Sequence, residues 1–575
     1  MNIKNMDIKN LSGTVFVSPQ ISSQDLSALA AQGITTIINN RPDGEAPRQP
    51  KHITLKTKAE ALGVNYHFLP ITPGKMSEQD VIKFAEILNT APGPILAFCR
   101  TGTRSTNLWA QAQIHTQAGE MSAHDIIQSA KSAGYDLSNL KPLLEKAEKI
   151  PQKKPQKNRA HDIVIVGGGS AGLATAASLL KRRPKLDIAI IEPSELHYYQ
   201  PGWTMVGGGI FTSKETERKT RALMPKNAKW IKAKVSKFHP DDNTVALEDG
   251  SHISYKILVA APGLQLDFDK IEGLEATLGQ NGVTSNYRYD LASYTWELVQ
   301  NLKKGTAIFT QPPMPIKCAG APQKAMYLSG DHWFKKGVLE NINIEFCNAG
   351  GVLFGVKAYV PALMEYIKKY RTNLNFSENL IKVDGPNKIA WFEKTDTNGK
   401  VKIIKRSFDM LHICPPQSAP EFIKSSPLAN AVGWIDVDPE TLHHVRYPNI
   451  YALGDACSTP NAKTMAAARK QAPIVATNVI AKMEGLNTHA VYDGYGSCPL
   501  TVERGKIILA EFGYGGKILP SFPKWFLDGT KPTRLAWILK EKILPPMYWK
   551  GMLKGKEWLV KPDPKNHVPT IDLAE

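Results

Sequence analysis

The stretch HDIVIVGGGSAGLATAASLLKRR, residues 161–183, decides the fold of most of this chain. It joins a β-branched run to an Ala- and Leu-rich run through Gly167, Gly169 and Gly172 in G-x-G-x-x-G spacing. Between a strand and a helix, that spacing predicts a dinucleotide site. The three glycines would give a tight turn, a close approach of the backbone to a pyrophosphate, and close packing of helix on strand.

Two more features fit such a site. Ser170 and Ala171 open the predicted helix, whose free N–H groups favour the negative charge of a diphosphate. A second strand is predicted over 187–191, and Glu192 follows it, twenty residues after Gly172. A carboxylate at that position accepts hydrogen bonds from an adenosine ribose. We therefore expect these residues to bind the adenosine diphosphate part of a dinucleotide.

A distant segment completes the same predicted domain. Short strands lead to ISYKILVAAPG, which ends at Gly263, and YPNIYALGDACSTPNAKT places Asp455 directly after Gly454. An aspartate that follows a buried strand in this way suits a ribityl or phosphate-side hydroxyl. We expect 161–283 and 436–482 to form one Rossmann-type domain, with FAD as its cofactor.

The segment between them, 284–435, is predicted to be a second, degenerate nucleotide-type domain. Its first strand, 306–310, runs into QPPMPIKCAGAPQK, and proline lacks the N–H that a pyrophosphate cradle uses. A later candidate, EFCNAGGVLFG, lacks the G-x-G-x-x-G spacing. Binding of NAD(P)H is therefore disfavoured, and the electrons must come from another donor.

Length and charge narrow the class of protein. The 575 residues indicate about three or four domains. The 71 Lys+Arg exceed the 53 Asp+Glu, for a formal net charge of +18, which favours an anionic partner. No nucleic-acid motif accompanies the charge, so we expect a membrane surface.

No secretory signal and no run of about eighteen apolar residues is visible. The six cysteines are widely spaced, which predicts individual thiols and no metal site.

Residues 1–145 are predicted to form a separate small α/β domain, because short strands alternate with helical stretches. A Lys-, Gln- and Pro-rich linker, 146–160, follows it. The expected strands are 14–17, 35–38, 66–69 and 94–98, and the expected helices are 22–32, 77–90 and 104–118.

The last of these strands runs into CRTGTRS, which places Cys99 and Arg104 at the start of a helix. Helix N-terminal amides and the arginine stabilise a thiolate there, and the same loop would hold an anion. Together with GITTIINNRPDGE, the motif resembles phosphatase-like domains that are also joined to persulfide-handling hydrolases. Tyrosine phosphatases have five residues between Cys and Arg, whereas the four present here match rhodanese-type sulfurtransferases.

Three functions stay open for this domain. Phe98 stands where phosphatases have histidine, and the ITPGKMS loop offers no convincing general-acid aspartate, which disfavours phosphatase activity. Sulfur transfer at Cys99 is favoured, with Arg104 as its cation. The alternatives are a phosphatase and a retained, inactive fold that docks a partner.

The C-terminal region, 483–575, contains two predicted amphipathic helices on either side of Pro545 and Pro546. Apolar residues recur there at helical spacing, with interspersed lysines and a concentration of tryptophans. Such helices suit a monotopic membrane anchor that reaches a quinone dissolved in lipid. Packing on the protein's own core is the alternative.

Six stretches within 161–555 carry a family resemblance: HYYQPGWTMVGGG, PIKCAGAPQKAMYLS, DMLHICPPQSAP, the Gly454-Asp455 segment, YDGYGSCPL and ILAEFGY. They resemble sulfide:quinone oxidoreductases, most closely the type that includes the mitochondrial enzyme. The resemblance implies an FAD-dependent enzyme that oxidises sulfide and reduces a quinone.

The resemblance also implies the residues of the reaction. Cys318 and a second cysteine, assigned to Cys457, would form a redox pair bridged as a disulfide or trisulfide beside the flavin. Sulfide attacks the bridge, leaving a persulfide on Cys457 and a thiolate on Cys318. A small thiol, sulfite or another sulfide then takes the sulfane sulfur, and the flavin accepts the electron pair.

The second cysteine departs from the mitochondrial pattern. There it directly follows the aspartate, whereas Ala456 intervenes here, so Cys347 is the fallback. Cys347 and Cys414 are otherwise expected to be small buried hydrophobes, and Cys498 to be structural. Lys463 is expected near the flavin N1 and C2 oxygen, with a solvated surface lysine as the alternative.

The favoured function is sulfide:quinone oxidation at a membrane, with sulfane sulfur passed on, directly or through a small carrier, to Cys99. The alternative is an NADH:quinone-type flavoprotein reductase fused to a protein-phosphatase-like domain. We expect a peripheral membrane protein on the cytoplasmic side. The sequence allows a homo-oligomer and predicts neither a metal nor a nucleic-acid partner.

Overall fold

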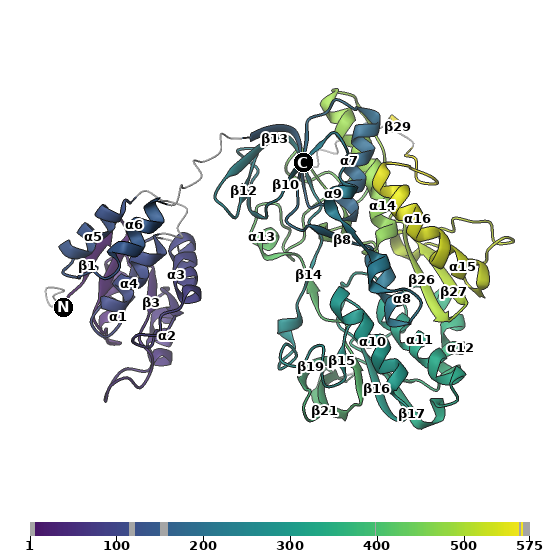
Figure 1. Cartoon of the computed structure of the whole chain (residues 1–575), viewed down its shortest axis with the longest axis horizontal. Helices are drawn as coiled ribbons and strands as arrows, with labels where there is room; N and C mark the ends of the chain where they lie inside the picture. The colour runs from purple at the N-terminus through teal and green to yellow at the C-terminus, as the bar shows by residue number, and fades with distance from the viewer. Residues whose placement is uncertain are drawn as a thin grey trace. The chain divides into compact units, whose positions relative to one another are not determined.

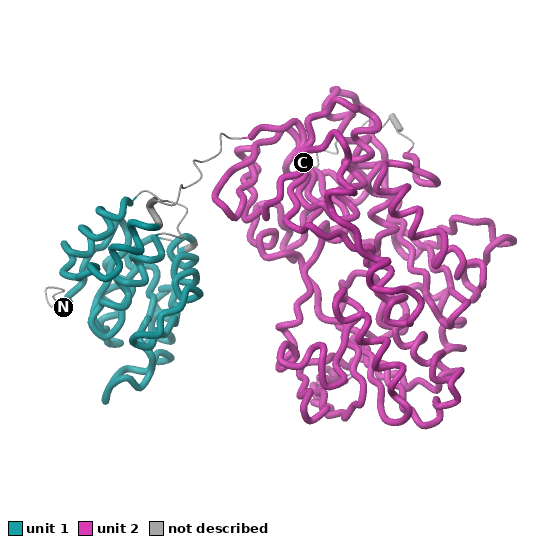
Figure 2. The backbone as a smooth tube through the Cα atoms, in the orientation of Figure 1, with its two compact units in different colours: residues 1–156 teal, residues 157–575 magenta. Residues whose placement is uncertain are grey.

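The computed structural model describes residues 6–91, 93–113, 121–149, 159–396, 398–562 and 565–566. The chain divides into two compact units, residues 1–156 (the N-terminal unit) and 157–575 (the C-terminal unit; Figure 2). Each is an α/β structure with its own hydrophobic core, which confirms the predicted fold class. Residues 150–158 of the predicted linker lie outside the described residues, and its two ends belong to α6 (Lys141–Lys149) and β6 (Arg159–Val166).

The N-terminal unit is built on a five-stranded sheet in the order β1-β2-β5-β3-β4. Figure 1 labels β1 and β3 of this sheet among the helices of the unit. Neighbouring strands are parallel except β1, which pairs antiparallel with β2. The strands are β1 (Lys9–Ser12), β2 (Val15–Ser18), β3 (Thr36–Asn39), β4 (Asn65–Phe68) and β5 (Ile95–Phe98). The helices are α1 (Asp25–Ala31), α2 (His52–Ala61), α3 (Glu78–Thr90), α4 (Thr103–Ala112), α5 (Ala123–Ser132) and α6.

Each of the four predicted strands of this unit lies within one residue of an observed strand. Strand β1 and helices α2, α5 and α6 were not predicted from the sequence. Residues 114–118 of the predicted helix 104–118 lie outside the described residues. Strands β3 and β5 are buried along their whole length, as central parallel strands are. The loop from β5 to α4 therefore lies at the carboxyl end of a central strand.

The C-terminal unit begins with a seven-stranded sheet in the order β10-β7-β6-β13-β12-β11, with β24 added beside β13. Strands β6, β13 and β24 are parallel, so the residues that follow β6 and β24 meet at one edge of the sheet. Helices α7 (Ser170–Arg182) and α14 (Met465–Met483) pack together. The other strands are β7 (Ile188–Ile191), β10 (Ala228–Ile231), β11 (Val235–His239), β12 (Thr244–Leu247), β13 (His252–Ala260) and β24 (Ile450–Ala452).

A second sheet of five parallel strands follows, in the order β15-β22-β16-β17-β18. The strands are β15 (Val283–Thr284), β16 (Gly305–Gln311), β17 (Ile342–Asn348), β18 (Asn373–Phe376) and β22 (Met410–His412). Its helices are α10 (Tyr289–Asn301), α11 (Ala321–Lys335) and α12 (Val360–Lys369). An antiparallel sheet is formed by β19 (Glu378–Asp384), β20 (Ile389–Thr395) and β21 (Val401–Ser407).

The remaining elements of this unit are short. They are β8 (Leu196–Tyr198), α8 (Trp203–Gly207), β9 (Glu217–Lys219), α9 (Thr220–Leu223), β14 (Gln265–Leu266), β23 (Gln417–Ser418), α13 (Glu421–Lys424), β25 (Thr488–His489) and β29 (Lys565–Asn566). Toward the end of the chain, β26 (Gly496–Glu503) and β27 (Lys506–Phe512) form a hairpin, with β28 (Pro532–Thr533) beside β27.

After β28 the chain forms α15 (Arg534–Ile538), a π-helical segment (Leu539–Ile543) and α16 (Leu544–Lys550) without a gap. The predicted break at Pro545 and Pro546 is therefore wrong. Both prolines lie in the first turn of α16, where a missing N–H is tolerated. Among the described residues, no helix is both long and apolar enough to cross a bilayer.

Only part of the predicted amphipathic surface faces outward. Trp537, Met552 and Leu553 are buried in the cores of the C-terminal unit. Other large apolar side chains of this region are exposed and are called the C-terminal apolar surface below: Trp525, Phe526, Leu535, Ile538, Ile543, Trp558 and Leu559. Packing on the protein's own core thus accounts for part of the apolar pattern, and the C-terminal apolar surface stays exposed.

Candidate functional site

The glycine-rich loop between β6 and α7 fits a bound diphosphate. Gly167 has φ +99°, and a Cβ there would lie 2.3 Å from the carbonyl oxygen of Ala261. A Cβ on Gly172 would lie 1.9 Å from the carbonyl oxygen of Gly167, whereas nothing lies within 4 Å of a Cβ on Gly169. Packing therefore requires the first and third glycines, and the second leaves open space at the N-terminus of α7, where a pyrophosphate binds.

The carboxylate of Glu192 is fixed beside this loop. Its Oε2 accepts a hydrogen bond from the N–H of Gly168 at 2.7 Å, and its Oε1 accepts one from the N–H of Ser194 at 2.7 Å. Ser170 Oγ lies 2.7 Å from the hydroxyl oxygen of Tyr548 in α16, so the C-terminal helix contacts the loop directly. The oxygens of Glu192 keep lone pairs for a ribose hydroxyl.

A cavity of about 380 Å³ joins these residues to a cysteine. Every residue predicted to bind the cofactor, except Gly172, lines it, including Ala171 and Gly263. Cys318 lines the same cavity. The geometry thus brings the dinucleotide loop, the segment after β24 and a thiol together around one space large enough to admit a ligand.

Asp455 and Lys463 lie inside this site. Lys463 is 7% exposed, so it is not the solvated surface lysine of the alternative interpretation. Its Nζ donates a hydrogen bond to the carbonyl oxygen of Cys457 at 2.9 Å and lies 4.2 Å from the ring centroid of Trp434. Burial raises the pKa of Asp455, and the ammonium groups of Lys463 and Lys317 oppose that rise. The position of Lys463 relative to a flavin stays a prediction.

Cys318 lies in the loop between β16 and α11, and a second thiol approaches it from β26. The sulfurs of Cys318 and Cys498 are 3.8 Å apart, and both cysteines are free thiols. A Cβ on Gly320 would lie 2.4 Å from Cys498 Sγ. The glycine in Cys-Ala-Gly is therefore what lets β26 bring its cysteine to the pair.

Lys324, on the first turns of α11, turns its ammonium to this pair. The group is 2% exposed, and its Nζ donates a hydrogen bond to Cys318 Sγ at 3.1 Å. The hydrogen bond from Cys498 and the charge of Lys324 outweigh burial and lower the pKa of Cys318 well below its usual range. The same hydrogen bond, together with burial, raises the pKa of Cys498. Because Lys324 Nζ contacts Cys318 Sγ, the site favours the thiolate on Cys318, with Cys498 placed to donate a hydrogen bond to it.

A second buried lysine, Lys540, comes from the π-helical segment. It is 2% exposed, lines the cavity, and donates a hydrogen bond to the carbonyl oxygen of Pro201 at 2.9 Å. Burial, followed by the charge of Lys324, lowers the pKa of Lys540 to about 7. Neither lysine was predicted from the sequence. Lys324 lies six residues after Cys318 in the stretch PIKCAGAPQKAMYLS, where its nearness to the cysteine was the available signal.

Cys457, the expected partner of Cys318, lies elsewhere. Its side chain is part of the hydrophobic core of the first sheet, and its sulfur lies 3.1 Å from the carbonyl oxygen of Gly454 and 3.0 Å from Thr459 Oγ1. The turn after β24 directs it into that core and away from the cavity lining. The structure therefore corrects the pairing: Cys318 faces Cys498, the residue expected to be structural.

The other two cysteines behave as small buried groups. Cys347, the fallback partner, is 0% exposed in β17, with its sulfur 3.8 Å from Asn375 Nδ2. Cys414 is 1% exposed, and Gln417 Nε2 lies 3.8 Å from its sulfur. Burial raises the pKa of both thiols. Neither is placed to act as the nucleophile of the pair.

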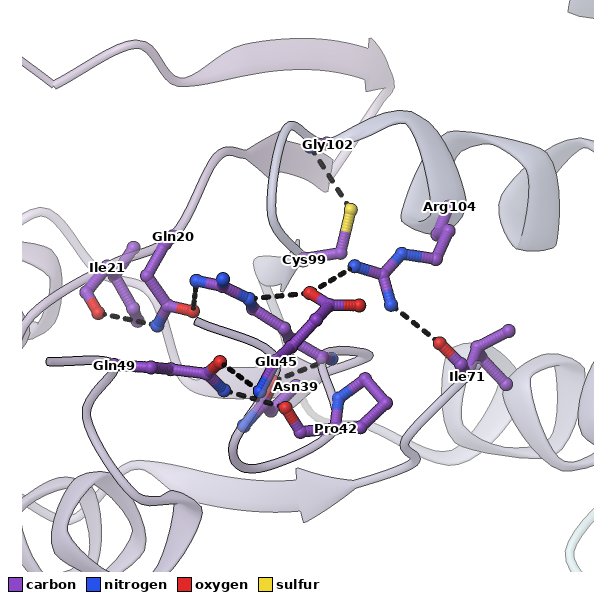
Figure 3. A network of polar contacts seen from close by, with 11 residues as sticks. Gln20, Ile21, Asn39, Pro42, Glu45, Gln49, Ile71, Cys99, Gly102 and Arg104 are labelled. Carbon is purple, nitrogen blue, oxygen red and sulfur yellow. Dashed lines mark hydrogen bonds and ion pairs between the residues drawn. The ribbon is translucent and has the colours of Figure 1, made fainter. Parts of the chain in front are cut away.

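In the N-terminal unit, Cys99 directly follows β5 and Arg104 lies in the first turn of α4. The buried sulfur of Cys99 accepts a hydrogen bond from the N–H of Gly102 at 3.2 Å. Arg104, however, donates to the carbonyl oxygen of Ile71 at 2.6 Å and to Glu45 Oε2 at 2.7 Å (Figure 3). The predicted cradle is thus formed by the loop, but its arginine is engaged by a carboxylate that the sequence analysis did not single out.

Comparison with known proteins gives different family matches for the two units. Residues 7–116 match the phosphatase-like domain of beta-lactamase hydrolase-like proteins, and residues 161–308 match the pyridine nucleotide-disulphide oxidoreductase family. The mitochondrial sulfide:quinone oxidoreductase of Dictyostelium discoideum is 42% identical over 77% of this chain and 99% of its own length.

Two further matches complete this comparison. The beta-lactamase hydrolase-like protein of Agrobacterium fabrum is 36% identical over 22% of this chain and 28% of its own length. The crystal structure of the sulfide:quinone oxidoreductase from Aquifex aeolicus shares the fold, with a TM-score of 0.57 and 20% identity over 69% of this chain and 92% of that one.

Proposed function

Since the chain belongs to the sulfide:quinone oxidoreductase family, we propose that it oxidises sulfide at the pair formed by Cys318 and Cys498 and delivers the electrons to a membrane quinone. One observation carries this assignment. The two sulfurs lie 3.8 Å apart, with Lys324 Nζ 3.1 Å from Cys318 Sγ, at the cavity that the dinucleotide loop lines.

The residues around that cavity fit FAD as the flavin. The N-terminus of α7 would hold its diphosphate, Glu192 its ribose, and Asp455 a hydroxyl of the chain between the phosphates and the flavin ring. The space beside Gly169 supports this assignment, because no atom lies within 4 Å of a Cβ placed there.

The chemistry of the pair follows from its charges. Hydrosulfide attacks Cys498 in a Cys318–Cys498 bridge, the bond between the cysteine sulfurs breaks, and Cys318 leaves as a thiolate beside Lys324. Cys498 then carries the persulfide. A small thiol, sulfite or sulfide takes its outer sulfur and leaves the Cys498 thiolate. Re-formation of the bridge releases an electron pair, which bound FAD would accept and pass to quinone.

Anaerobic stopped-flow mixing with sulfide tests the assignment. Cys498→Ser should slow sulfide-dependent flavin reduction by at least about a thousandfold, because removal of a covalent-catalysis sulfur abolishes the step. Cys457→Ser is the matched control and should stay near the wild-type rate. If Cys457→Ser abolished reduction and Cys498→Ser did not, the pair would be assigned to the wrong cysteine. Rapid bleaching of the flavin by NADH would favour the alternative reductase.

A second function is proposed for the N-terminal unit: Cys99 receives sulfane sulfur that a small persulfide carries away from Cys498. The four-residue spacing from Cys99 to Arg104 and the Gly102 N–H at 3.2 Å from Cys99 Sγ support it. Given glutathione persulfide, the peptide that contains Cys99 should gain the mass of one sulfur atom. Release of phosphate from aryl phosphates without such a gain would favour a phosphatase.

We propose that the C-terminal apolar surface meets the membrane, on the cytoplasmic side. Leu559, which is 78% exposed on this surface, also lines the cavity, as do Leu539 and Met547. A quinone dissolved in lipid could then reach the site without crossing water, and the net charge of +18 favours anionic headgroups.

A further inference from the structure

The arginine of the Cys99 loop is already held by a carboxylate. Arg104 Nη2 lies 2.7 Å from Glu45 Oε2, and Arg41 Nε donates to the same oxygen at 2.8 Å. The side chain of Arg41 is 6% exposed, and those of Arg104 and Glu45 are 15% and 16% exposed. Figure 3 shows the carboxylate of Glu45 facing the guanidinium of Arg104, below the cysteine loop. The carboxylate of Glu45 and the two guanidinium groups are thus paired where little of each side chain is exposed to solvent.

Glu45 is positioned by its own loop and stays charged there. Its N–H donates to Gln49 Oε1 at 3.1 Å, and Gln49 Nε2 donates to the carbonyl oxygen of Pro42 at 2.7 Å. Burial raises the pKa of Glu45, but Arg104 and Arg41 outweigh burial and the pKa is lowered. Its second oxygen, Oε1, is buried and has no hydrogen-bond partner within the part of the chain that the structure describes.

A fixed anion at this place decides which substrates fit. A phosphate monoester brings between about one and two negative charges at neutral pH and is bound best by a bidentate arginine. To bind here, it would have to displace Glu45 from Arg104 and then lie beside an unpaired carboxylate. A persulfide transfers its outer sulfur as a neutral atom, so it needs access to Cys99 but no free guanidinium.

The loop is closed on the other side by an aromatic residue. A Cβ on Gly102 would lie 1.9 Å from the hydroxyl oxygen of Tyr135, which donates a hydrogen bond to the carbonyl oxygen of Thr101 at 3.2 Å. The tyrosine therefore packs against the loop that would otherwise surround a tetrahedral anion. Both neighbours of the loop, Glu45 and Tyr135, disfavour a bulky dianion.

We propose that Glu45 is the selectivity residue of the Cys99 loop: it occupies Arg104, excludes phosphate monoesters, and reserves the loop for persulfides of small thiols. The proposal rests on the sulfur-receiving function proposed above. In that step the Cys99 thiolate attacks the outer sulfur of the persulfide, a sulfur–sulfur bond forms, and the bond to the carrier breaks. The carrier leaves as a thiol with the proton of the persulfide, and no oxidant or reductant is consumed.

Protection of Cys99 by inorganic phosphate tests the proposal on the full-length protein. Alkylation of Cys99 by iodoacetamide is followed by mass spectrometry at rising phosphate concentration. We expect Glu45→Gln to be protected with an affinity at least about tenfold higher than wild type, because a neutral amide competes with phosphate for Arg104 less well than a carboxylate does. Glu60→Gln, which removes an exposed carboxylate from α2, should behave like wild type.

Three outcomes would overturn the proposal: equal protection of wild type and Glu45→Gln, no protection of either, or stronger protection of Glu60→Gln than of wild type. Arg41→Gln is a second variant, which keeps the Arg104–Glu45 contact and should still exclude phosphate if its melting transition is intact. Uptake of sulfur from glutathione persulfide is measured separately. Failure of wild-type Cys99 to take up sulfur would refute the sulfur-receiving function, whereas the phosphate result reports on Glu45 alone.

Discussion

The two thiol sites of this chain differ in the cation beside the sulfur. At Cys318 a buried lysine places its Nζ 3.1 Å from the sulfur. At Cys99 a backbone N–H, that of Gly102, lies 3.2 Å from the sulfur, and Arg104 is paired with a carboxylate. A redox pair must release one cysteine as a thiolate in every turnover, and a point charge in a buried site favours that state. At Cys99 the donor beside the attacking sulfur is a neutral backbone N–H instead of an ammonium group.

Both sites also depend on a glycine, for different neighbours. A Cβ on Gly320 would lie 2.4 Å from Cys498 Sγ, and a Cβ on Gly102 would lie 1.9 Å from the hydroxyl of Tyr135. In the first site the missing side chain admits a second thiol, and in the second it admits a phenol. The comparison indicates that the C-terminal unit is built for exchange between two sulfurs, and the N-terminal unit for a single thiol.

Among changes that keep both sulfurs, the largest effect should come from removing the cation of the redox pair. Lys324→Met should raise the lowered pKa of Cys318. When the pH falls, the Cys318 thiolate of the variant is therefore protonated at a higher pH than the thiolate of the wild type. We expect the midpoint of Cys318 alkylation to move up by about one to three pH units. Flavin reduction by sulfide at neutral pH should slow by at least about a hundredfold, because the leaving thiolate loses its charge partner.

Lys336→Met is the control for that change. It removes a cation from the exposed C-terminal end of the same helix, α11. We expect its alkylation profile and reduction rate to match wild type. An unchanged alkylation midpoint in Lys324→Met would mean that Cys498, and not the lysine, sets the charge of Cys318.

A smaller effect should follow from pushing the two sulfurs apart. Gly320→Ala puts a Cβ into Cys498 Sγ, and overpacking of this kind costs about 1–3 kcal/mol of unfolding free energy. A shift of the reacting atoms should slow sulfide-dependent reduction by about tenfold to a hundredfold. Thermal denaturation and stopped-flow measure the two effects. Gly351→Ala, where no atom lies within 4 Å, should change neither.

The sequence was sufficient where the chemistry is local. The roles of Gly167 and Gly172 follow from spacing within one turn, and both glycines are required by contacts in the observed loop. The loop from Cys99 to Arg104 was predicted for the same reason. Spacing could not predict that Arg104 is paired with a carboxylate, because that carboxylate belongs to Glu45, 59 residues earlier in the chain.

The redox pair shows where sequence reasoning ends. Cys318 and Cys498 are 180 residues apart, and their contact depends on how β26 packs against α11. The alternation of Cys498, Leu500 and Val502 predicts a buried face of a strand but not the element that it faces. Cys457 was predicted to be the partner of Cys318 because it lies shortly after Asp455. The turn after β24 instead places its side chain in the hydrophobic core of the first sheet. Lys540 reaches the site from a helix that was predicted to bind a membrane, with packing on the core as the alternative, and neither interpretation indicates a residue of the site.

The smallest effect is expected for exposed apolar side chains, which differ between the two units in their proposed contact with lipid. Trp525 and Trp558 are 86% and 52% exposed on the C-terminal apolar surface, whereas Ile53 is an exposed apolar residue of the N-terminal unit. Trp525→Ser should weaken binding to anionic lipid vesicles by about tenfold, since partial insertion of a large apolar side chain contributes about 1.5 kcal/mol, the lower end of the value for full burial, and about 1.4 kcal/mol is tenfold. Trp558→Ser should do the same to a lesser degree.

Ile53→Ser is the matched control in the sedimentation assay, because it removes an exposed apolar side chain from a unit with no proposed lipid contact. Electron transfer to a water-soluble quinone should be unchanged in all three variants, because the redox pair is untouched. Transfer to a quinone dissolved in the vesicles should fall with binding in the tryptophan variants only. If Ile53→Ser weakened vesicle binding and electron transfer as much as the tryptophan variants, membrane binding would depend on exposed apolar residues in general. The C-terminal apolar surface would then not be the route by which quinone enters.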